Sequence, residues 1–181
     1  MLKITVPESE MYNEETNEFF YVKETVLCLE HSLVSISKWE SKWKKPFLGP
    51  EPKTAEEVLD YIKCMTITQN VPDIVYQCLT KKNKDEIGAY IQDEHTATWF
   101  NEQGNKKTSE IVTSELIYYW MTAFNIPFEC QKWHLNRLLT LVKICSIKND
   151  PKASKKMSRQ AVMRQNAALN KARRAKTGSR G

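Results

Sequence analysis

Cysteine and histidine are the residues of this sequence whose types and spacing first suggest chemistry. Cys130 and His134 stand four residues apart in a segment with a helical pattern, so we expect them on one face of a helix. Such a pair can bind zinc if other parts of the chain supply two more ligands. A core thiol beside a surface histidine is the simpler interpretation, and Glu129 with His134 does not form the HExxH motif of zinc hydrolases. We therefore expect no metal site.

Catalytic arrangements find no stronger support. Five cysteines and three histidines allow many Cys–His pairs on paper, but most of the cysteines lie in apolar runs, where burial makes a thiol unreactive. The run Asp93-Glu94-His95 could act as an acid–base group, although a solvated polar loop explains it more simply. The sequence contains no GxGxxG, GxSxG or phosphate-binding loop. We predict a protein that is not an enzyme and uses no cofactor.

The cysteine spacing and the apolar runs indicate a compartment. No CxxC motif occurs, and five widely spaced cysteines do not suggest a zinc ribbon or a dense disulfide framework. The first residues lack the apolar run of a secretory signal, and no stretch approaches the roughly 18 apolar residues of a membrane span. We expect a soluble protein with free thiols in a reducing cytoplasm.

Charge is distributed unevenly along the chain. Of the 27 basic residues, ten lie in 151–181, which contains no acidic residue, whereas 1–150 holds the other 17 and all 22 acidic residues. This composition predicts a compact body over 1–150 and a basic tail over 151–181 that is a fraying helix or disordered. The tail could bind nucleic-acid phosphates, dock on an acidic partner or on the body, or keep the protein soluble. The basic side chains expected to contribute are Lys155, Lys156, Arg159, Arg164, Lys171, Arg173, Arg174 and Lys176.

The first thirty residues have the pattern of strands. Leu2, Ile4 and Val6 alternate with polar residues, and the runs 19–22 and 25–29 are rich in β-branched and aromatic residues. The polar segment 8–18 between them fits a turn. We predict a small antiparallel sheet.

Helical spacing begins after the strands. Apolar residues recur at every third or fourth position from Leu33 to Trp43, with Ser32 as the expected cap. Residues 54–57 form a capping box for a helix that continues to Met65. Further helix starts are predicted at Pro72 and at the capping sequence 83–86.

The strongest helical pattern lies between 109 and 149. Apolar residues occupy most of the circumference of 109–125, which predicts a central, nearly surrounded helix. Pro127 can start a second helix with an apolar stripe from Phe128 to Cys145, and so short a link predicts an antiparallel helix hairpin. The predicted fold is mainly α with a small N-terminal antiparallel β-sheet, an α+β body followed by the basic tail.

Aromatic and basic residues alternate between Trp39 and Phe47. Platforms that stack nucleic-acid bases combine these residue types. Trp39 and Trp43 stand at i and i+4, however, and aromatics at this spacing usually pack in a core. Duplex binding also needs a basic face on the fold itself, whereas 1–150 is acidic. We favour packing for this stretch.

Several runs of the sequence resemble a family of tailed-bacteriophage proteins that are identified as tail assembly chaperones of long-tailed phages. The resemblance covers nearly the whole chain. It is carried by the run from Glu30 to Trp43, Lys45-Pro46-Phe47-Leu48, the run from Thr54 to Met65, Ile117 to Met121, Asn125 to Leu139, Met157-Ser158-Arg159 and Ala167-Ala168-Leu169-Asn170.

The resemblance implies a non-enzymatic role in the host cytoplasm. Chaperones of this kind bind the long, helical tape-measure protein before the tail tube polymerises around it, and the tail tube protein is a further expected partner. Extended amphipathic helices bind grooves lined by aromatic and flexible apolar side chains. The expected lining residues, chosen because they stand near helix ends or in loops, are Trp43, Phe47, Trp99, Phe100 and Trp133.

Two other roles stay open at this stage. One is a structural virion component, such as a tail-completion or head-tail connector protein. The other is a nucleic-acid-binding protein that uses the basic tail. The sequence also leaves open whether the protein forms oligomers.

Overall fold

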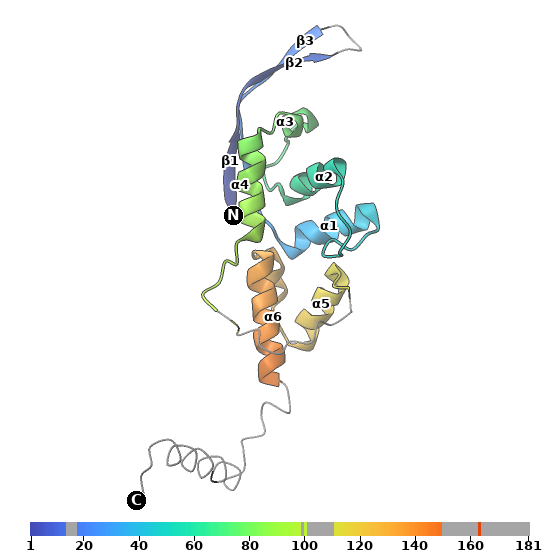
Figure 1. Ribbon diagram of the computed structural model, residues 1–181, viewed down its shortest axis with the longest axis vertical. Coiled ribbons are helices and arrows are strands. Elements are labelled where there is room, and N and C mark those ends of the chain that lie inside the picture. The colour runs from blue at the N-terminus through green and yellow to red at the C-terminus, as the bar shows by residue number, and fades with distance from the viewer. Residues whose placement is uncertain (14–17, 99, 101–110, 150–162, 164–181) are drawn as a thin grey trace, which may run out of the picture. The chain divides into compact units, whose positions relative to one another are not determined.

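The computed structural model describes residues 1–13, 18–98, 100, 111–149 and 163 (Figure 1). Within them the chain is mainly helical, with two small antiparallel sheets near the N-terminus, which confirms the predicted fold class. The chain divides into two units, Met1–Val142 and Lys143–Gly181, and the division falls inside the helix Leu135–Asn149. Apart from Met163, the predicted basic tail lies outside the described residues.

The N-terminal strands form a two-stranded ribbon. Strand β1 (Leu2–Val6) pairs with β4 (Thr25–Leu29), and β2 (Ser9–Asn13) pairs with β3 (Glu18–Val22). The turn predicted over 8–18 is therefore wrong where β2 forms. Met11 and Tyr12 stand opposite Phe20 and Phe19, and this cross-strand pairing outweighs the weak strand propensity of the polar segment.

Helices α1 (Leu33–Trp43) and α2 (Ala55–Met65) begin where their capping residues predict. The hydroxyl of Ser32 accepts from the N–H of Ser35, and the hydroxyl of Thr54 accepts from the N–H of Glu57. The two helices pack against each other through Trp39, which is 1% exposed. Its indole Nε1 donates a 2.9 Å hydrogen bond to the carbonyl oxygen of Glu57.

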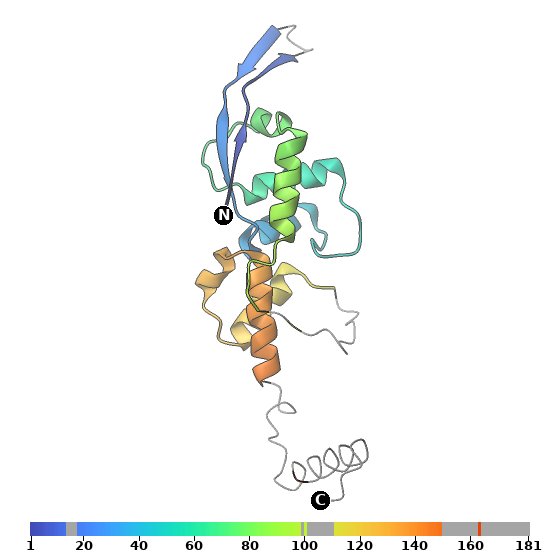
Figure 2. The ribbon, with the colours of Figure 1, turned by 60° about the vertical axis from the view of Figure 1, so that its left-hand side comes forward.

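Helix α3 (Asp73–Gln77) follows Pro72 as predicted, and α4 (Lys81–Gln92) begins earlier than the capping sequence 83–86 suggests. Thr80 is the cap, and its hydroxyl accepts from the N–H of Asn83 at 3.1 Å. The amide of Asn83 also donates to the carbonyl oxygen of Thr5 at 3.1 Å. Asn83 is therefore the third residue of α4 and joins this helix to β1, which lies beside it in two views (Figures 1 and 2).

The C-terminal elements of the body differ from the predicted pair of long helices. Helix α5 (Ser114–Ala123) buries only Ser114, Ile117 and Met121, and Tyr119 is 66% exposed, so it is not the nearly surrounded helix expected. After Pro127 the chain forms a 3-10 helix, η1 (Phe128–Lys132), and then α6 (Leu135–Asn149). The predicted direct hairpin is wrong because the N–H of Leu135 bonds to the carbonyl oxygen of His31, which interrupts the helix near His134.

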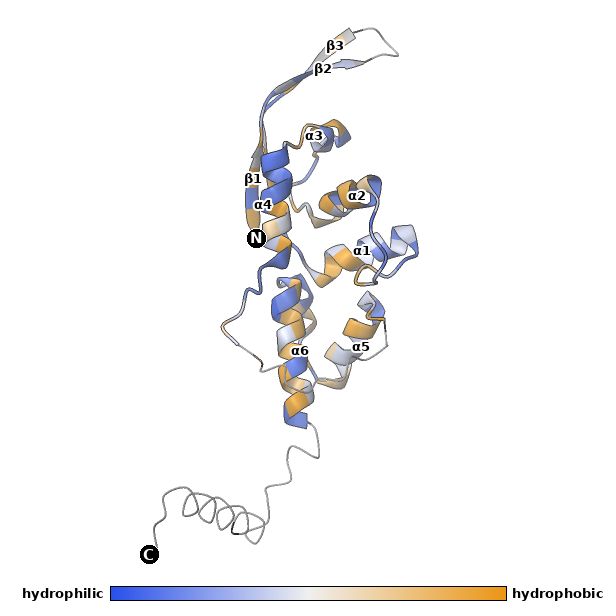
Figure 3. Ribbon diagram, in the orientation of Figure 1, coloured by the Kyte–Doolittle hydropathy of each residue, from blue (hydrophilic) through white to orange (hydrophobic). Residues whose placement is uncertain are grey.

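Helix α1 lies at the centre of the packing in the first unit. It contacts α2, α5 and η1, and its first turns are among the apolar segments of Figure 3. The N-terminal turns of α4 are hydrophilic in the same figure. Among the described helices, none is long and apolar enough to cross a membrane.

Candidate functional site

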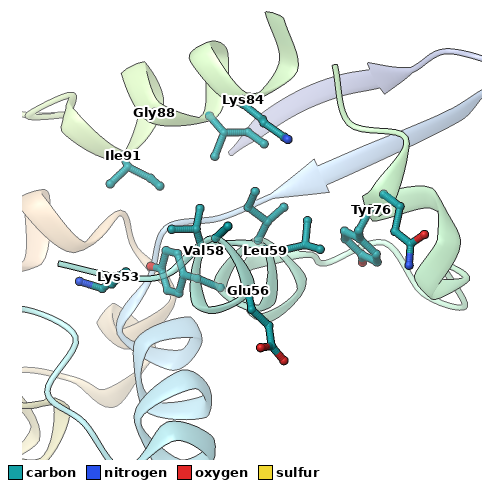
Figure 4. A pocket seen from close by; sticks show the side chains of 13 residues that line it. Lys53, Glu56, Val58, Leu59, Tyr76, Lys84, Gly88 and Ile91 are labelled. Carbon is teal, nitrogen blue, oxygen red and sulfur yellow. The ribbon is translucent and has the colours of Figure 1, made fainter. Parts of the chain in front are cut away.

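A groove of about 600 Å³ lies between α2 and α4, and we call it the helical groove (Figure 4). Apolar side chains from successive turns of both helices line it, and α3 contributes Tyr76 and Gln77 at one end. Charged residues stand at its margin. The described lining is made by Lys53, Ala55, Glu56, Val58, Leu59, Tyr61, Ile62, Tyr76, Gln77, Lys84, Ile87, Gly88 and Ile91.

Periodicity explains why these side chains share one cavity. On α2, Ile62 stands four residues after Val58 and three after Leu59. On α4, Ile87 and Ile91 are four apart. Val58 is 46% exposed although it lies among apolar neighbours. An apolar stripe that faces an open groove leaves surface that a partner can cover.

Gly88 widens the helical groove in the middle of α4. A methyl group added at this position would meet no atom within 4 Å, so neither a close helix contact nor a strained backbone requires glycine there. Glycine inside a helix costs about 1 kcal/mol relative to alanine. The residue therefore lowers the stability of the helix while it keeps space open along the groove.

Of the five predicted lining residues, the four that the structure describes are not among the described lining of this groove. Phe47 is 9% exposed, and its ring packs 4.0 Å from that of Tyr61, measured between centroids. Trp43 is half-buried and donates from Nε1 to Asp60 at 2.9 Å. Trp133 is half-buried with the guanidinium of Arg137 4.2 Å from its ring centroid. Phe100 is half-buried, and Trp99 lies outside the described residues.

The helical groove was not predicted from the sequence, because the expected lining consisted of aromatic residues near helix ends or in loops. The exposed apolar residues of α2 and the glycine of α4 were available signals. Val58 begins the apolar stripe that follows the capping box, and Gly88 interrupts a helical pattern at a position that faces that stripe only in the folded chain. Pairing the two helices needs tertiary information, which the periodicity of a single segment does not contain.

All three histidines of the chain lie close together, and we call them the histidine cluster. The ring centroid of His134 lies 5.1 Å from that of His31 and 4.0 Å from that of His95. Nε2 of His134 bonds to the carbonyl oxygen of Tyr90 at 3.0 Å, whereas its buried Nδ1 has no hydrogen-bond partner. The cluster comes from three separate segments, so the sequence alone did not predict it.

Burial disfavours the charged forms of His31 and His134 in the histidine cluster. Loss of hydration lowers the pKa of His31 to about 3, and the neighbouring His134 and His95 reinforce this shift. Burial also lowers the pKa of His134. The phenol of Tyr61, whose pKa burial raises, stays protonated, and its oxygen forms a hydrogen bond with Nδ1 of His31 at 2.5 Å.

The Cys130 and His134 pair is arranged differently from expectation, whereas Asp93, Glu94 and His95 are exposed and lie outside helices and strands, as the solvated-loop interpretation predicts. Cys130 is buried in η1, and His134 stands before α6, so the two do not share one helix face. Asp93, Glu94 and His95 follow α4, and His95 Nε2 lies 3.6 Å from an oxygen of Asp93. No group of three or more metal-binding side chains with suitable placement occurs within the described part of the chain.

No family model, no curated protein and no solved structure matches the chain. The function must therefore be inferred from the residues and from the helical groove.

Proposed function

We propose that the protein is a phage tail assembly chaperone that holds an amphipathic helix of the tape-measure protein in the helical groove. The observation that supports this most directly is the open, apolar space between α2 and α4 at Gly88. The resemblance to tail assembly chaperones names the partner. The protein would act in the host cytoplasm, before the tail tube forms.

The groove has the chemistry that an amphipathic helix needs. Its apolar residues recur at helical spacing on both walls, so a partner with apolar side chains at i, i+3, i+4 and i+7 can lay them between the walls. Lys53, Glu56 and Lys84 stand among the lining residues and can pair with the polar flank of such a helix. Held in this way, the apolar stripe of a tape-measure segment is kept from aggregating.

The lining favours binding over catalysis. Among its described residues are no cysteine, serine or histidine, the side chains that most often act as nucleophile or base. A cavity of this size also accommodates small molecules, but those sites place a few polar groups at their centre. Here the charged side chains belong to Lys53, Glu56 and Lys84, and the centre is apolar.

The test is co-expression of the full chain with the tape-measure protein from the same genome, followed by pull-down and measurement of soluble tape-measure protein. Val58→Glu introduces a charge into the groove. Val26→Glu is the matched control, because Val26 on β4 is 50% exposed and Val58 is 46% exposed. We expect Val58→Glu to abolish co-purification and Val26→Glu to retain it.

Two results would contradict the proposal. The first is no co-purification of the unaltered chain together with its presence in mature virions, which would indicate a structural tail component. The second is equal binding by both variants, which would place the partner elsewhere on the protein. Circular dichroism of each variant must show an unchanged helical spectrum.

A further inference from the structure

The β2–β3 hairpin extends past α3 and α4 as a separate arm of the first unit (Figures 1 and 2). Its register places Tyr12 opposite Phe19 and Glu10 opposite Tyr21. Because side chains alternate between the faces of a strand, these four residues share one face.

The other face of the hairpin is turned to the body. Val22 is 5% exposed, and Met11, half-buried, has its sulfur 3.4 Å from the sulfur of Cys78, which follows α3. The face with Tyr12, Phe19 and Tyr21 is therefore the outer one. We call these three residues the aromatic face.

The three aromatic side chains of this face remain largely exposed although two of them form a stabilising cross-strand pair. Tyr12 and Phe19 form a cross-strand pair with ring centroids 5.0 Å apart, which stabilises the ladder. Even so, Tyr12 is 48%, Phe19 69% and Tyr21 60% exposed. Single exposed apolar residues are ordinary, but adjacent large ones mark contact surfaces.

Charge restricts what can cover this face. Residues 8–24 contain six glutamates and one basic residue, Lys23. Glu10 stands on the aromatic face itself, and the carboxylate of Glu8 accepts a hydrogen bond from the hydroxyl of Tyr21. Nucleic acids and anionic membranes would be repelled, since their binding surfaces need cations. A second hairpin of the same kind would also bring like charges together.

We propose that the aromatic face binds a polypeptide segment rich in arginine and lysine. Aromatic rings attract cations over their faces, and carboxylates beside them add charge-assisted hydrogen bonds. Arginine fits better than lysine, because its planar guanidinium stacks on a ring while it bonds to a carboxylate. The hairpin is thus a second binding surface, separate from the helical groove and independent of the function proposed for it.

Fluorescence anisotropy with labelled decamers of arginine and of lysine tests this inference on the full chain. The triple variant Tyr12→Ser, Phe19→Ser, Tyr21→Ser removes the rings without a change in charge. Tyr119→Ser is the matched control, because Tyr119 is a 66% exposed aromatic on α5. We expect the unaltered chain to bind the arginine peptide more tightly than the lysine peptide. The triple variant should weaken arginine-peptide binding by about tenfold, and the control by less than about twofold.

A second variant separates the role of the face from damage to the hairpin. Glu10→Gln keeps the rings and the strand register, so it should fold normally and still weaken binding of the arginine peptide. The inference is overturned if the triple variant and Tyr119→Ser bind equally, or if Glu10→Gln has no effect. It is also overturned if an oligonucleotide binds the hairpin, or if the triple substitution abolishes self-association of the chain, because either result assigns the face to another partner.

Discussion

The phenol oxygen of Tyr61 lies 2.5 Å from Nδ1 of His31, so one hydrogen bond joins the wall of the helical groove to the histidine cluster. Both residues are buried, and they come from different parts of the chain. Protonation of His31 would place a charge in this buried site, where it loses hydration. The folded state therefore depends on a neutral imidazole at this position.

Stability should fall in mild acid for this reason. The pKa of His31 is about 3 in the folded chain, and that of an unfolded histidine is about 6.5, so the unfolded state binds more protons between these values. The contribution is complete above pH 6.5 and is lost as the pH falls toward 3. In that window, His31 lowers the free energy of unfolding by about 1.4 kcal/mol for each pH unit of acidification.

Urea unfolding at pH 7.5 and pH 5 measures this effect, since few carboxylates titrate between these values. His31→Gln keeps a side-chain acceptor for Tyr61 and should reduce the pH dependence. His95→Gln serves as the comparison from the same cluster, because the His95 side chain is 32% exposed. Equal free energies of unfolding at the two pH values would rule out a neutral, buried cluster.

Glu40 should be essential for stability because it joins three segments. Its two carboxylate oxygens accept from the N–H groups of Phe47, at 2.7 Å, and Ser114, at 2.8 Å. Glu40→Ala leaves both donors without a partner, and we expect it to cost about 2–4 kcal/mol in the free energy of unfolding. Glu86→Ala removes only an exposed contact with Lys82 at 3.9 Å and should cost less than about 0.5 kcal/mol. Similar melting temperatures for the two variants would contradict the assigned role.

Thr80 and Asn83 provide a test of where α4 begins. Thr80→Ala removes the cap and should lower the free energy of unfolding by about 1 kcal/mol. Asn83→Ala keeps that backbone cap but removes the amide oxygen that accepts from the N–H of Thr80 and the amide that donates to Thr5, so it should cost more. If Thr80→Ala proved neutral in urea unfolding, the helix would not be capped by this residue.

Much of the local structure follows from short-range chemistry that the sequence displays. Ser32 and Thr54 mark helix starts correctly, because a cap acts on N–H groups only two or three residues away. Pro72 marks the start of α3 without a side-chain cap, because its fixed φ suits the beginning of a helix. Strand β2 and the break before α6 were not predictable in this way. Both depend on partners distant in sequence, Phe19 and Phe20 for β2 and His31 for α6.

The helical groove was even less predictable from local sequence patterns than these elements. Trp43 and Phe47 have the residue types of a binding surface, yet contacts with Asp60 and Tyr61 from α2 draw them into the packed body. Val58 has an ordinary residue type and becomes part of a groove only because α4 lies opposite. A site made by two helices is determined by their packing, which local patterns do not specify.

A small substitution at Gly88 should change the free energy of unfolding without changing partner binding. Gly88→Ala should raise the free energy of unfolding by about 0.5–1 kcal/mol, because alanine favours the helix and the site has room for its methyl group. Thermal unfolding followed by circular dichroism measures this change. A lower melting temperature would show that the position is not open.

The most direct test of the helical groove compares Gly88→Leu with Gly88→Ala. Both replace glycine in α4, but only leucine is large enough to fill the groove. Isothermal titration calorimetry with a synthetic amphipathic segment of the tape-measure protein measures the affinity of each. We predict that Gly88→Ala binds like the unaltered chain and that Gly88→Leu binds about tenfold more weakly or worse, because its side chain occupies the space of a partner residue. Equal affinity of a folded Gly88→Leu variant would contradict the account.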